Sequence, residues 1–412
     1  MPLSAIAAAW PLLLGMGVLM LGAGLQSTLL GVRATGEGFP TAAIGAIMSC
    51  YYVGFLFGTT LAPYLIRQVG HVRVFAAFAS VAAVATLSHA VFVDPIPWAI
   101  MRLLTGMCFA GIYVVAESWL NDHATQATRS RLLAIYMLVL YVGLGASQFL
   151  LLASDPSTDL PFMLVAGLIC LAIVPLVLSA HPAPVVLQPR SVRFRDLYKL
   201  SPLGVVAVAM SGFMSAIVFS MGPVYGRLSG MDTAAISTFM AANILAGVVT
   251  QYPIGALADR MSRRAVIAGV CALSAALCLG IVLWPQMPPA LVMAMSALAS
   301  GLVLTIYSLG LSHVNDRLDP SQMVAASSAL LLINGAAAVI GPILGGALMG
   351  RYQSPAYFVT LGSLAAALTV FCLWRTSRRA GVPREQRGPY LNAQPETSAV
   401  VVEPPSSATK VD

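Results

Sequence analysis

Two ionisable side chains lie inside a long apolar stretch of this sequence, where a charge is costly. Arg102 and Glu117 both fall in the stretch 97–120, and Glu117 is the only carboxylate well inside any such stretch. On an α-helix they share one face with Gly106 and Tyr113. A charge at the middle of a bilayer costs roughly 2.5–3.5 kcal/mol, so such groups usually face protein or water. Desolvation also favours the protonated form of a carboxyl group, which suits Glu117 to carry a proton.

A structural role for Glu117 fits the same position. The residue lies about 10 Å along the helix from the centre of its stretch, close to one end. There, Arg73 or Arg131 could pair with it. The sequence leaves both roles open.

The elements that carry these residues must be membrane helices. The chain has 412 residues, of which 58% are hydrophobic and 9% charged, and its mean hydropathy is +0.86. A soluble protein needs more charge on its surface, whereas lipid tolerates an apolar exterior. About 20 helical residues span the apolar core of a bilayer, and such stretches occur at 10–31, 42–66, 74–93, 97–120, 131–153, 161–180, 203–226, 234–258, 265–284, 288–313, 322–349 and 355–375. The pattern predicts an all-α membrane protein with twelve transmembrane helices.

The basic residues are unevenly distributed between the two sides of the predicted membrane. With the N-terminus inside, the outer loops carry only Arg33, Arg227 and Arg351 of the 22 Lys and Arg residues. Cytoplasmic loops are the ones rich in Lys and Arg, so both termini are predicted to be cytoplasmic. We therefore expect a multi-pass protein of the bacterial inner membrane, in contact with lipid and not with nucleic acid.

The two halves of the chain resemble each other. Residues 41–44 (Thr-Ala-Ala-Ile) recur at 233–236, and Asn121-Asp122 recurs as Asn315-Asp316 in a similar register. Six-helix repeats related by an axis along the membrane normal place the binding site at their interface. The predicted organisation is an N-terminal bundle at 1–180, a cytoplasmic linker at 181–202, a C-terminal bundle at 203–375 and a disordered cytoplasmic tail at 376–412.

The most specific motif is a short basic turn between the eighth and ninth predicted spans. Its sequence, GALADRMSRR at 255–264, resembles the signature of the major facilitator superfamily. The resemblance implies a transporter with two pseudo-symmetric six-helix bundles. It also implies that the acid of the turn caps a neighbouring helix, while the arginines pair with carboxylates at adjacent helix ends. The implied cytoplasmic gate comprises Asp259, Arg260, Arg263, Arg264, Asp316 and, in the other half, Asp122.

The first half departs from this signature. Pro63 stands where the signature has Gly, and Arg67 stands where it has the acid. A gate in that half is therefore in doubt, and a basic turn that merely follows the charge distribution is the alternative in both halves.

Two further motifs resemble parts of the same superfamily. Arg102 and Gly106 match an RxxxG motif whose arginine is associated with proton coupling, and the ESWL ending at 117–120 resembles the YcaD-like branch of bacterial facilitators. The run 335–346 resembles a motif of proton-driven antiporters, although it falls in the eleventh span and not the fifth. The run predicts either a helix that bends or simple close packing of helices. The residues that carry this prediction are Gly341, Pro342, Gly345 and Gly346.

Polar side chains within the spans are few, and they predict the lining of a substrate cavity. Each could instead bond a neighbouring helix. The predicted set is Gln26, Tyr51, Tyr113, Tyr141, Asn243, Tyr307 and Asn334.

These features predict a monomeric secondary active transporter that works by alternating access and is coupled to protons through Glu117 and Arg102. The small number of charged residues inside the spans favours a small uncharged or amphipathic organic substrate. The antiporter-like motifs favour efflux over uptake of a sugar or small metabolite. No Walker motif is present, and the six cysteines lie in apolar stretches without a CxxC pair, so neither a cofactor nor a metal is expected. The spans lack the residue cluster of an intramembrane enzyme, and a non-transporting sensor is a remote alternative.

Overall fold

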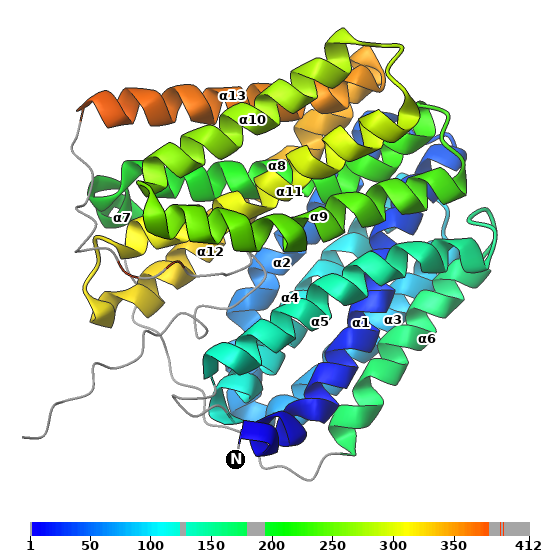
Figure 1. The fold of residues 1–412 in the computed structure, drawn as a ribbon. Coiled ribbons are helices and arrows are strands. Elements are labelled where there is room, and N and C mark those ends of the chain that lie inside the picture. The colour runs from blue at the N-terminus through cyan, green and yellow to red at the C-terminus, as the bar shows by residue number, and fades with distance from the viewer. Residues whose placement is uncertain (1, 124–128, 179–193, 379–387, 389, 391–412) are drawn as a thin grey trace, which may run out of the picture.

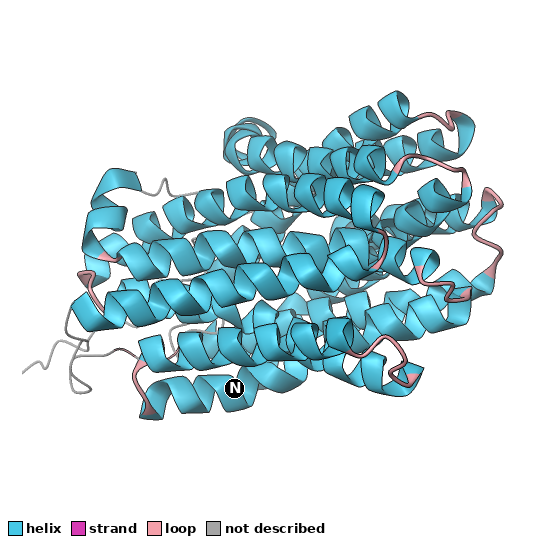
Figure 2. Ribbon diagram, turned by 90° about the horizontal axis from the view of Figure 1, so that it is seen from above, coloured by secondary structure: helices cyan, strands magenta, loops and turns pink. Residues whose placement is uncertain are grey.

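The computed structural model describes residues 2–123, 129–178, 194–378, 388 and 390. These residues form α-helices and one short 3-10 helix, with no strand among them (Figure 2). The elements are α1 (Pro2–Gly36), α2 (Thr41–Val69), α3 (His71–Val91), α4 (Pro95–His123), α5 (Arg129–Leu150), η1 (Leu151–Ala153), α6 (Leu160–Val177), α7 (Phe194–Leu200), α8 (Pro202–Leu228), α9 (Thr233–Arg260), α10 (Arg263–Leu283), α11 (Pro289–Asn315), α12 (Pro320–Tyr352) and α13 (Pro355–Arg378).

Within these residues, twelve α-helices are long and apolar enough to cross a membrane, and α7 is the one α-helix that is not. The predicted all-α class and the number of spans are confirmed. Most of the helices are longer than the predicted apolar stretches: α1 runs from Pro2 to Gly36, against a predicted 10–31. Two are shorter, since α5 ends at Leu150 and α6 at Val177, before the predicted 153 and 180. The short helix α7 lies in the segment predicted as linker, and α13 continues to Arg378, beyond the predicted start of the tail.

The internal repeat is visible in the backbone as well as in the sequence. Gly38 and Gly230 each lie three residues before a Thr-Ala-Ala-Ile helix start, and both have φ of 76°. Glycine adopts this left-handed conformation without the steric cost that a Cβ imposes. The turn between the first two helices of each half is therefore built in the same way.

Each half is a six-helix bundle with the same internal pairing. In α1–α6, helix α2 packs along α4, α1 along α5, and α3 along α6. In α8–α13, the equivalent pairs α9 with α11, α8 with α12, and α10 with α13 are also packed together. The second half thus repeats the packing of the first, as the sequence repeat predicts.

The two bundles meet mainly through three helix pairs, α2 with α12, α5 with α9, and α1 with α8. The closest approaches involve the start of α2 and the end of α12: a Cβ on Gly346 would lie 2.7 Å from the carbonyl oxygen of Thr41, and one on Gly45 would meet the carbonyl of Pro342. Gly31 near the end of α1 similarly meets Pro223 near the end of α8. In Figure 1 the bundles converge at this end and diverge toward the end that carries the N-terminus and α7.

Candidate functional site

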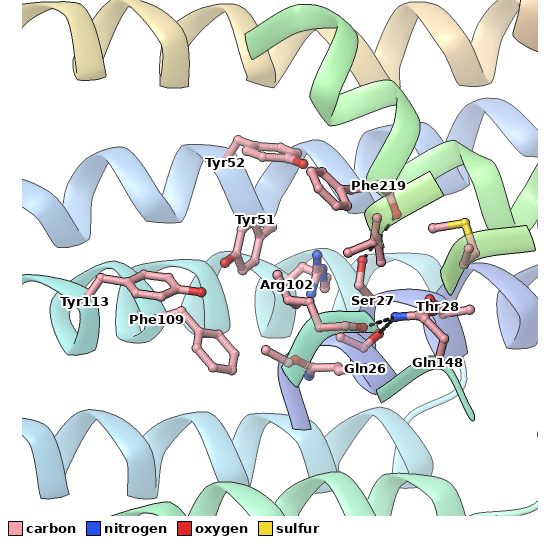
Figure 3. A pocket seen from close by; sticks show the side chains of 15 residues that line it. Gln26, Ser27, Thr28, Tyr51, Tyr52, Arg102, Phe109, Tyr113, Gln148 and Phe219 are labelled. Carbon is pink, nitrogen blue, oxygen red and sulfur yellow. Dashed lines mark hydrogen bonds between the residues drawn. The ribbon is translucent and has the colours of Figure 1, made fainter. Parts of the chain in front are cut away.

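A cavity lies between the bundles, close to where they converge. It contains about 640 Å³ of empty space, part of it open to solvent. Figure 3 shows its lining, which comes from α1, α2, α4 and α5 of the first bundle and from α8 and α9 of the second. The lining residues are Ala23, Gly24, Gln26, Ser27, Thr28, Tyr51, Tyr52, Arg102, Phe109, Tyr113, Leu144, Gln148, Phe219, Met240 and Ile244.

The two sides of this cavity differ in chemistry. All its polar side chains come from the N-terminal bundle, whereas the C-terminal bundle contributes Phe219, Met240 and Ile244. One hydrogen bond crosses between the bundles here, from the Ser27 hydroxyl to the Phe219 carbonyl oxygen at 3.4 Å. The cavity therefore has a polar wall and an apolar wall, as an amphipathic ligand requires.

Arg102 is the charged residue of this lining. Its side chain leaves α4 and is nearly buried, at 4% exposure, with the guanidinium carbon 4.5 Å from the centre of the Tyr51 ring. A cation over an aromatic face is attracted by the ring quadrupole, by about 2 kcal/mol when desolvated. Arg102 lies on the wall of the cavity, and its predicted role in proton coupling stays a prediction.

The amide side chains of the lining bond to other parts of the protein. Thr28 donates to Gln148 Oε1 at 2.5 Å. Gln148 Nε2 donates to the Ser147 hydroxyl and to the carbonyl oxygens of Leu144 and Gly24. Gln26 Nε2 donates to the Thr86 hydroxyl of α3 at 2.9 Å. This network fixes the polar wall across α1, α3 and α5.

The predicted cavity residues divide into two groups. Gln26, Tyr51 and Tyr113 line the cavity. The other four are not part of this lining, and their role in a substrate path stays a prediction. Asn334 donates to the Val208 carbonyl oxygen at 2.9 Å and ties α12 to α8. Asn243 accepts from Ser296 at 3.0 Å and ties α9 to α11.

The two remaining tyrosines are also buried elsewhere. Tyr307 belongs to a second apolar cluster with Val205, Val208 and Leu311, and Tyr141 is buried in α5 outside the lining. The prediction missed Tyr52, Phe109 and Phe219. A signal for the aromatic pair on α4 was available, because Phe109 and Tyr113 are spaced by four residues and so share a helix face with Arg102 and Gly106.

Glu117 is fully buried but does not line the cavity. It lies about 22 Å from Arg102 along α4, since fifteen residues separate them at about 1.5 Å each. Its carboxylate acts electrostatically on Tyr307 of α11, in the opposite bundle. Arg73 and Arg131, the structural partners that the sequence left open, are both exposed. Arg102 and Glu117 are thus two separate sites on one helix face.

Asp316 is expected to pair with Arg263 or Arg264, and the structure shows the pair with Arg263. The two side chains form a salt bridge at 2.7 Å between α10 and α11, and each side chain is only 2% exposed. Arg263 also donates to the carbonyl oxygens of Ser312 and Gly388. The guanidinium therefore joins α10, the end of α11 and the C-terminal segment.

Asp259 contacts Tyr390, and its implied capping of a neighbouring helix stays a prediction. Its carboxylate accepts from the backbone N–H of Tyr390 at 2.9 Å, while Ser262 caps α10 through Ala265. The Tyr390 ring lies against Gly255, beside Ser308, and burial raises the pKa of Tyr390 to about 12. Tyr390, which belongs to the predicted tail, thus binds the acid of the motif. The remaining predicted tail lies outside the described residues.

The other predicted gate residues are placed differently. Arg264 is buried, and its carbonyl oxygen accepts from the Cys372 thiol, whereas Arg260 is exposed at the end of α9. Asp122 lies in the last turn of α4, but its side chain is outside the described residues. The role of the whole set as a gate stays a prediction.

The glycines of α12 serve close packing. The helix is continuous from Pro320 to Tyr352 through Pro342. A Cβ on Gly341 would lie 2.5 Å from the Phe213 carbonyl oxygen of α8, and Gly346 faces α2. This is the close-packing alternative of the sequence, and bending at Pro342 stays a prediction.

Two matched six-helix bundles around a central cavity define the class of protein as a helical membrane transporter. The chain belongs to the Major Facilitator Superfamily, whose sequence model matches residues 12–314 and 204–408. It is 30% identical over 376 residues to the uncharacterized MFS-type transporter YcaD of Escherichia fergusonii, covering 90% of this chain and 96% of the relative. It is also 30% identical over 379 residues to an uncharacterized MFS-type transporter of Enterobacter sp. strain 638, covering 90% and 95%.

Solved structures share this fold at low sequence identity. The nucleoside transporter NupG superimposes with a TM-score of 0.72 at 14% identity, over 89% of this chain and 98% of its own. A bacterial homologue of the lysosomal transporter Spinster, in an inward-facing and unoccupied conformation, gives a TM-score of 0.70 at 15% identity, over 90% and 95%. The predicted superfamily and its YcaD-like branch are confirmed, and the protein is a multi-pass secondary transporter.

Proposed function

We propose that the protein moves a small amphipathic organic molecule across the bacterial inner membrane by alternating access, coupled to protons, with efflux as the direction. The observation that carries the proposal is the two-sided cavity between the bundles, polar on one wall and apolar on the other. An uncharged sugar would favour hydrogen-bonding groups on both walls. Phe219, Met240 and Ile244 offer none from their side chains, which disfavours the alternative of sugar uptake.

The arrangement of the bundles supports alternating access. Their close approaches lie at the end where α1 and α8 finish and α2 begins, which the distribution of Lys and Arg assigns to the outside. With both termini cytoplasmic, the bundles are in close contact on the outside. Transport then requires the contacts of α2 with α12 to separate while the opposite ends approach, as a rocking of one bundle against the other.

Proton coupling is assigned to Glu117. It is a carboxyl group buried completely within α4. Its charge acts on Tyr307 of the other bundle. A rocking motion changes the distance between these helices, so protonation of Glu117 and the conformation of the transporter are coupled through this electrostatic interaction. The protein is proposed to act as a monomer.

Glu117→Gln tests the coupling, because glutamine keeps the shape and cannot release a proton. In proteoliposomes with an imposed pH gradient, this variant should lose uphill accumulation of the substrate and retain exchange between labelled and unlabelled substrate. The substrate for the assay is the compound that most raises the unfolding temperature in a screen of metabolites and drugs. Accumulation is measured with and without a protonophore.

Glu37→Gln is the matched control. Glu37 makes a partly exposed salt bridge with Arg33 at 2.8 Å, four residues earlier in the chain, and ion pairs near the surface contribute little. This variant should accumulate substrate as the wild type does. Normal uphill transport by Glu117→Gln would exclude Glu117 as the proton carrier.

A further inference from the structure

We propose that the substrate of the central cavity is an organic monoanion, whose carboxylate binds the Arg102 guanidinium and whose apolar body lies against the opposite wall. This inference rests on the proposed transport function and adds the chemical class of the substrate. It refines the expected amphipathic molecule by assigning the charge of its polar end.

The first step is that the charge of Arg102 lacks an acidic counterpart. The titratable groups that interact with it electrostatically, among the described residues, are Tyr51, Tyr52, Cys50 and His89. Tyrosine and cysteine side chains are ordinarily neutral near pH 7, and histidine is neutral or positive. The Nε atom of Arg102 is also buried without a hydrogen-bond acceptor in the described structure.

The second step is energetic. An arginine is effectively always protonated, so it cannot relieve the cost of burial by losing its proton. The Tyr51 ring offsets part of this cost, by about 2 kcal/mol. A carboxylate would supply what the tyrosine cannot, namely an opposite charge and two oxygens that match the planar fork of N–H donors.

The third step is that the neighbouring polar groups already have partners within the protein. Gln148 and Thr28 bond each other, and Gln26 donates to Thr86. These bonds leave the Arg102 guanidinium as the strong donor group facing the cavity (Figure 3). Gln26 Oε1 is a buried acceptor without a bond in the described structure, and it suits an N–H or O–H group on the same ligand.

The remaining lining describes the rest of the molecule. Phe109 and Tyr113 lie on the same helix as Arg102, and Phe219, Met240 and Ile244 face them from the second bundle. Aromatic and aliphatic side chains bind an apolar body by excluding water. Since one guanidinium is present in the lining, a second negative charge on the ligand would be buried without a partner. The cavity thus fits one carboxylate and one apolar body.

Matched sets of simple ligands test the charge directly on the full-length wild-type protein in lipid nanodiscs. One set is phenylacetate, phenylacetamide and phenylethylamine, and the other is hexanoate, hexanamide and hexylamine. The midpoint of thermal unfolding is measured over a range of each concentration. The carboxylates should raise the midpoint, while the amides and amines of similar shape should bind roughly ten- to a hundredfold more weakly, because a hydrogen-bonded charge contributes about 1.5–3 kcal/mol.

Arg102→Gln should remove the difference between carboxylate and amide, and Arg102→Lys should retain part of it, since lysine keeps the charge and loses the fork. Each variant is first compared with the wild type by size-exclusion chromatography. If Arg102→Gln does not fold, the wild-type comparison and Arg102→Lys still decide the question. Equal stabilisation by all members of both sets, by none of them, or by the amines most strongly overturns the proposal.

The outcomes are separable from those of the proposed function. If the carboxylates bind but do not accumulate in response to a proton gradient, the proposed transport mechanism is wrong and the proposed ligand class stands. Proton-driven accumulation of a neutral or cationic compound that is unaffected by Arg102→Gln would mean the reverse.

Discussion

Gly54→Ala should lower the free energy of unfolding by about 3 kcal/mol, although alanine is the better helix former. A Cβ at this position would lie 1.9 Å from the Leu103 carbonyl oxygen and 2.9 Å from the Met107 amide nitrogen, both in the backbone of α4. Backbone atoms cannot turn aside as a side chain can, so α2 and α4 must move apart. Overpacking costs about 1–3 kcal/mol and occasionally more, and the rigidity of this contact places it at the upper end.

The same contact extends over several turns. Gly58 meets the carbonyl oxygen of Met107, and Gly106 on the facing helix meets that of Tyr51. Small residues allow helices in a membrane to approach closely enough for dispersion to hold them. The contact also positions the cavity, because Tyr51 on α2 and Arg102 on α4 both line it. Gly54→Ala should therefore weaken ligand binding as well as folding.

Gly167→Ala is the matched control for this prediction. Gly167 lies in α6 and a Cβ there would meet nothing within 4 Å, so the variant should keep the wild-type unfolding temperature or exceed it slightly. Unfolding is followed by tryptophan fluorescence of the purified protein in detergent. If the two alanine variants unfold at the same temperature, α2 and α4 are not held by the contact at Gly54.

The sequence predicted the fold well because lipid constrains it strongly. Every backbone polar group in the apolar core must bond within its own helix, so apolar stretches of sufficient length specify the spans. The repeat of Thr-Ala-Ala-Ile then gave the two bundles. The short helix α7 escaped prediction, since its seven residues, FRDLYKL, are too few and too polar for a hydropathy signal.

The site was predicted less well, and the polar side chains show why. A sequence indicates that Asn334 is polar and inside the membrane, but not which helix it faces. Asn334 bonds the Val208 carbonyl of α8, whereas Gln26 reaches both Thr86 and the cavity. The sequence predicted that Arg102 lies on a polar helix face. Its role depends on whether an acidic side chain lies near it, and only the folded arrangement determines that.

The contribution of the C-terminal segment was also beyond the sequence. The motif at 255–264 predicted an ion pair with Asp316, and this pair is present. Nothing in the residues after the last span indicated that Tyr390 would bond Asp259, or that the Gly388 N–H would approach Asp316 at 3.2 Å. Such contacts depend on the surface that the packed helices α9, α10 and α11 form together, which a linear sequence does not display.

Asp316→Asn should destabilise the protein by about 3–5 kcal/mol, the usual cost of leaving one member of a buried ion pair without its partner. The side chains of Arg263 and Asp316 are each only 2% exposed, so solvent screens the pair little. Arg378→Met is the control, because Arg378 is an exposed charge at the end of α13, and such substitutions change stability by about 0.5 kcal/mol or less. Thermal unfolding of the purified variants measures both.

Exchanging the two residues separates attraction between charges from the geometry of the site. The double variant Arg263→Asp with Asp316→Arg restores opposite charges, but it turns a carboxylate toward the carbonyl oxygens of Ser312 and Gly388, which Arg263 now serves as donor. An acceptor facing two acceptors is repelled, so we expect the exchange to recover less than half of the stability lost in Asp316→Asn. Full recovery would mean that the charges alone hold α10 to α11. Partial recovery would assign the remainder to the three-way bonding of Arg263, in which the planar fork joins a carboxylate and two backbone carbonyls that a reversed pair cannot serve.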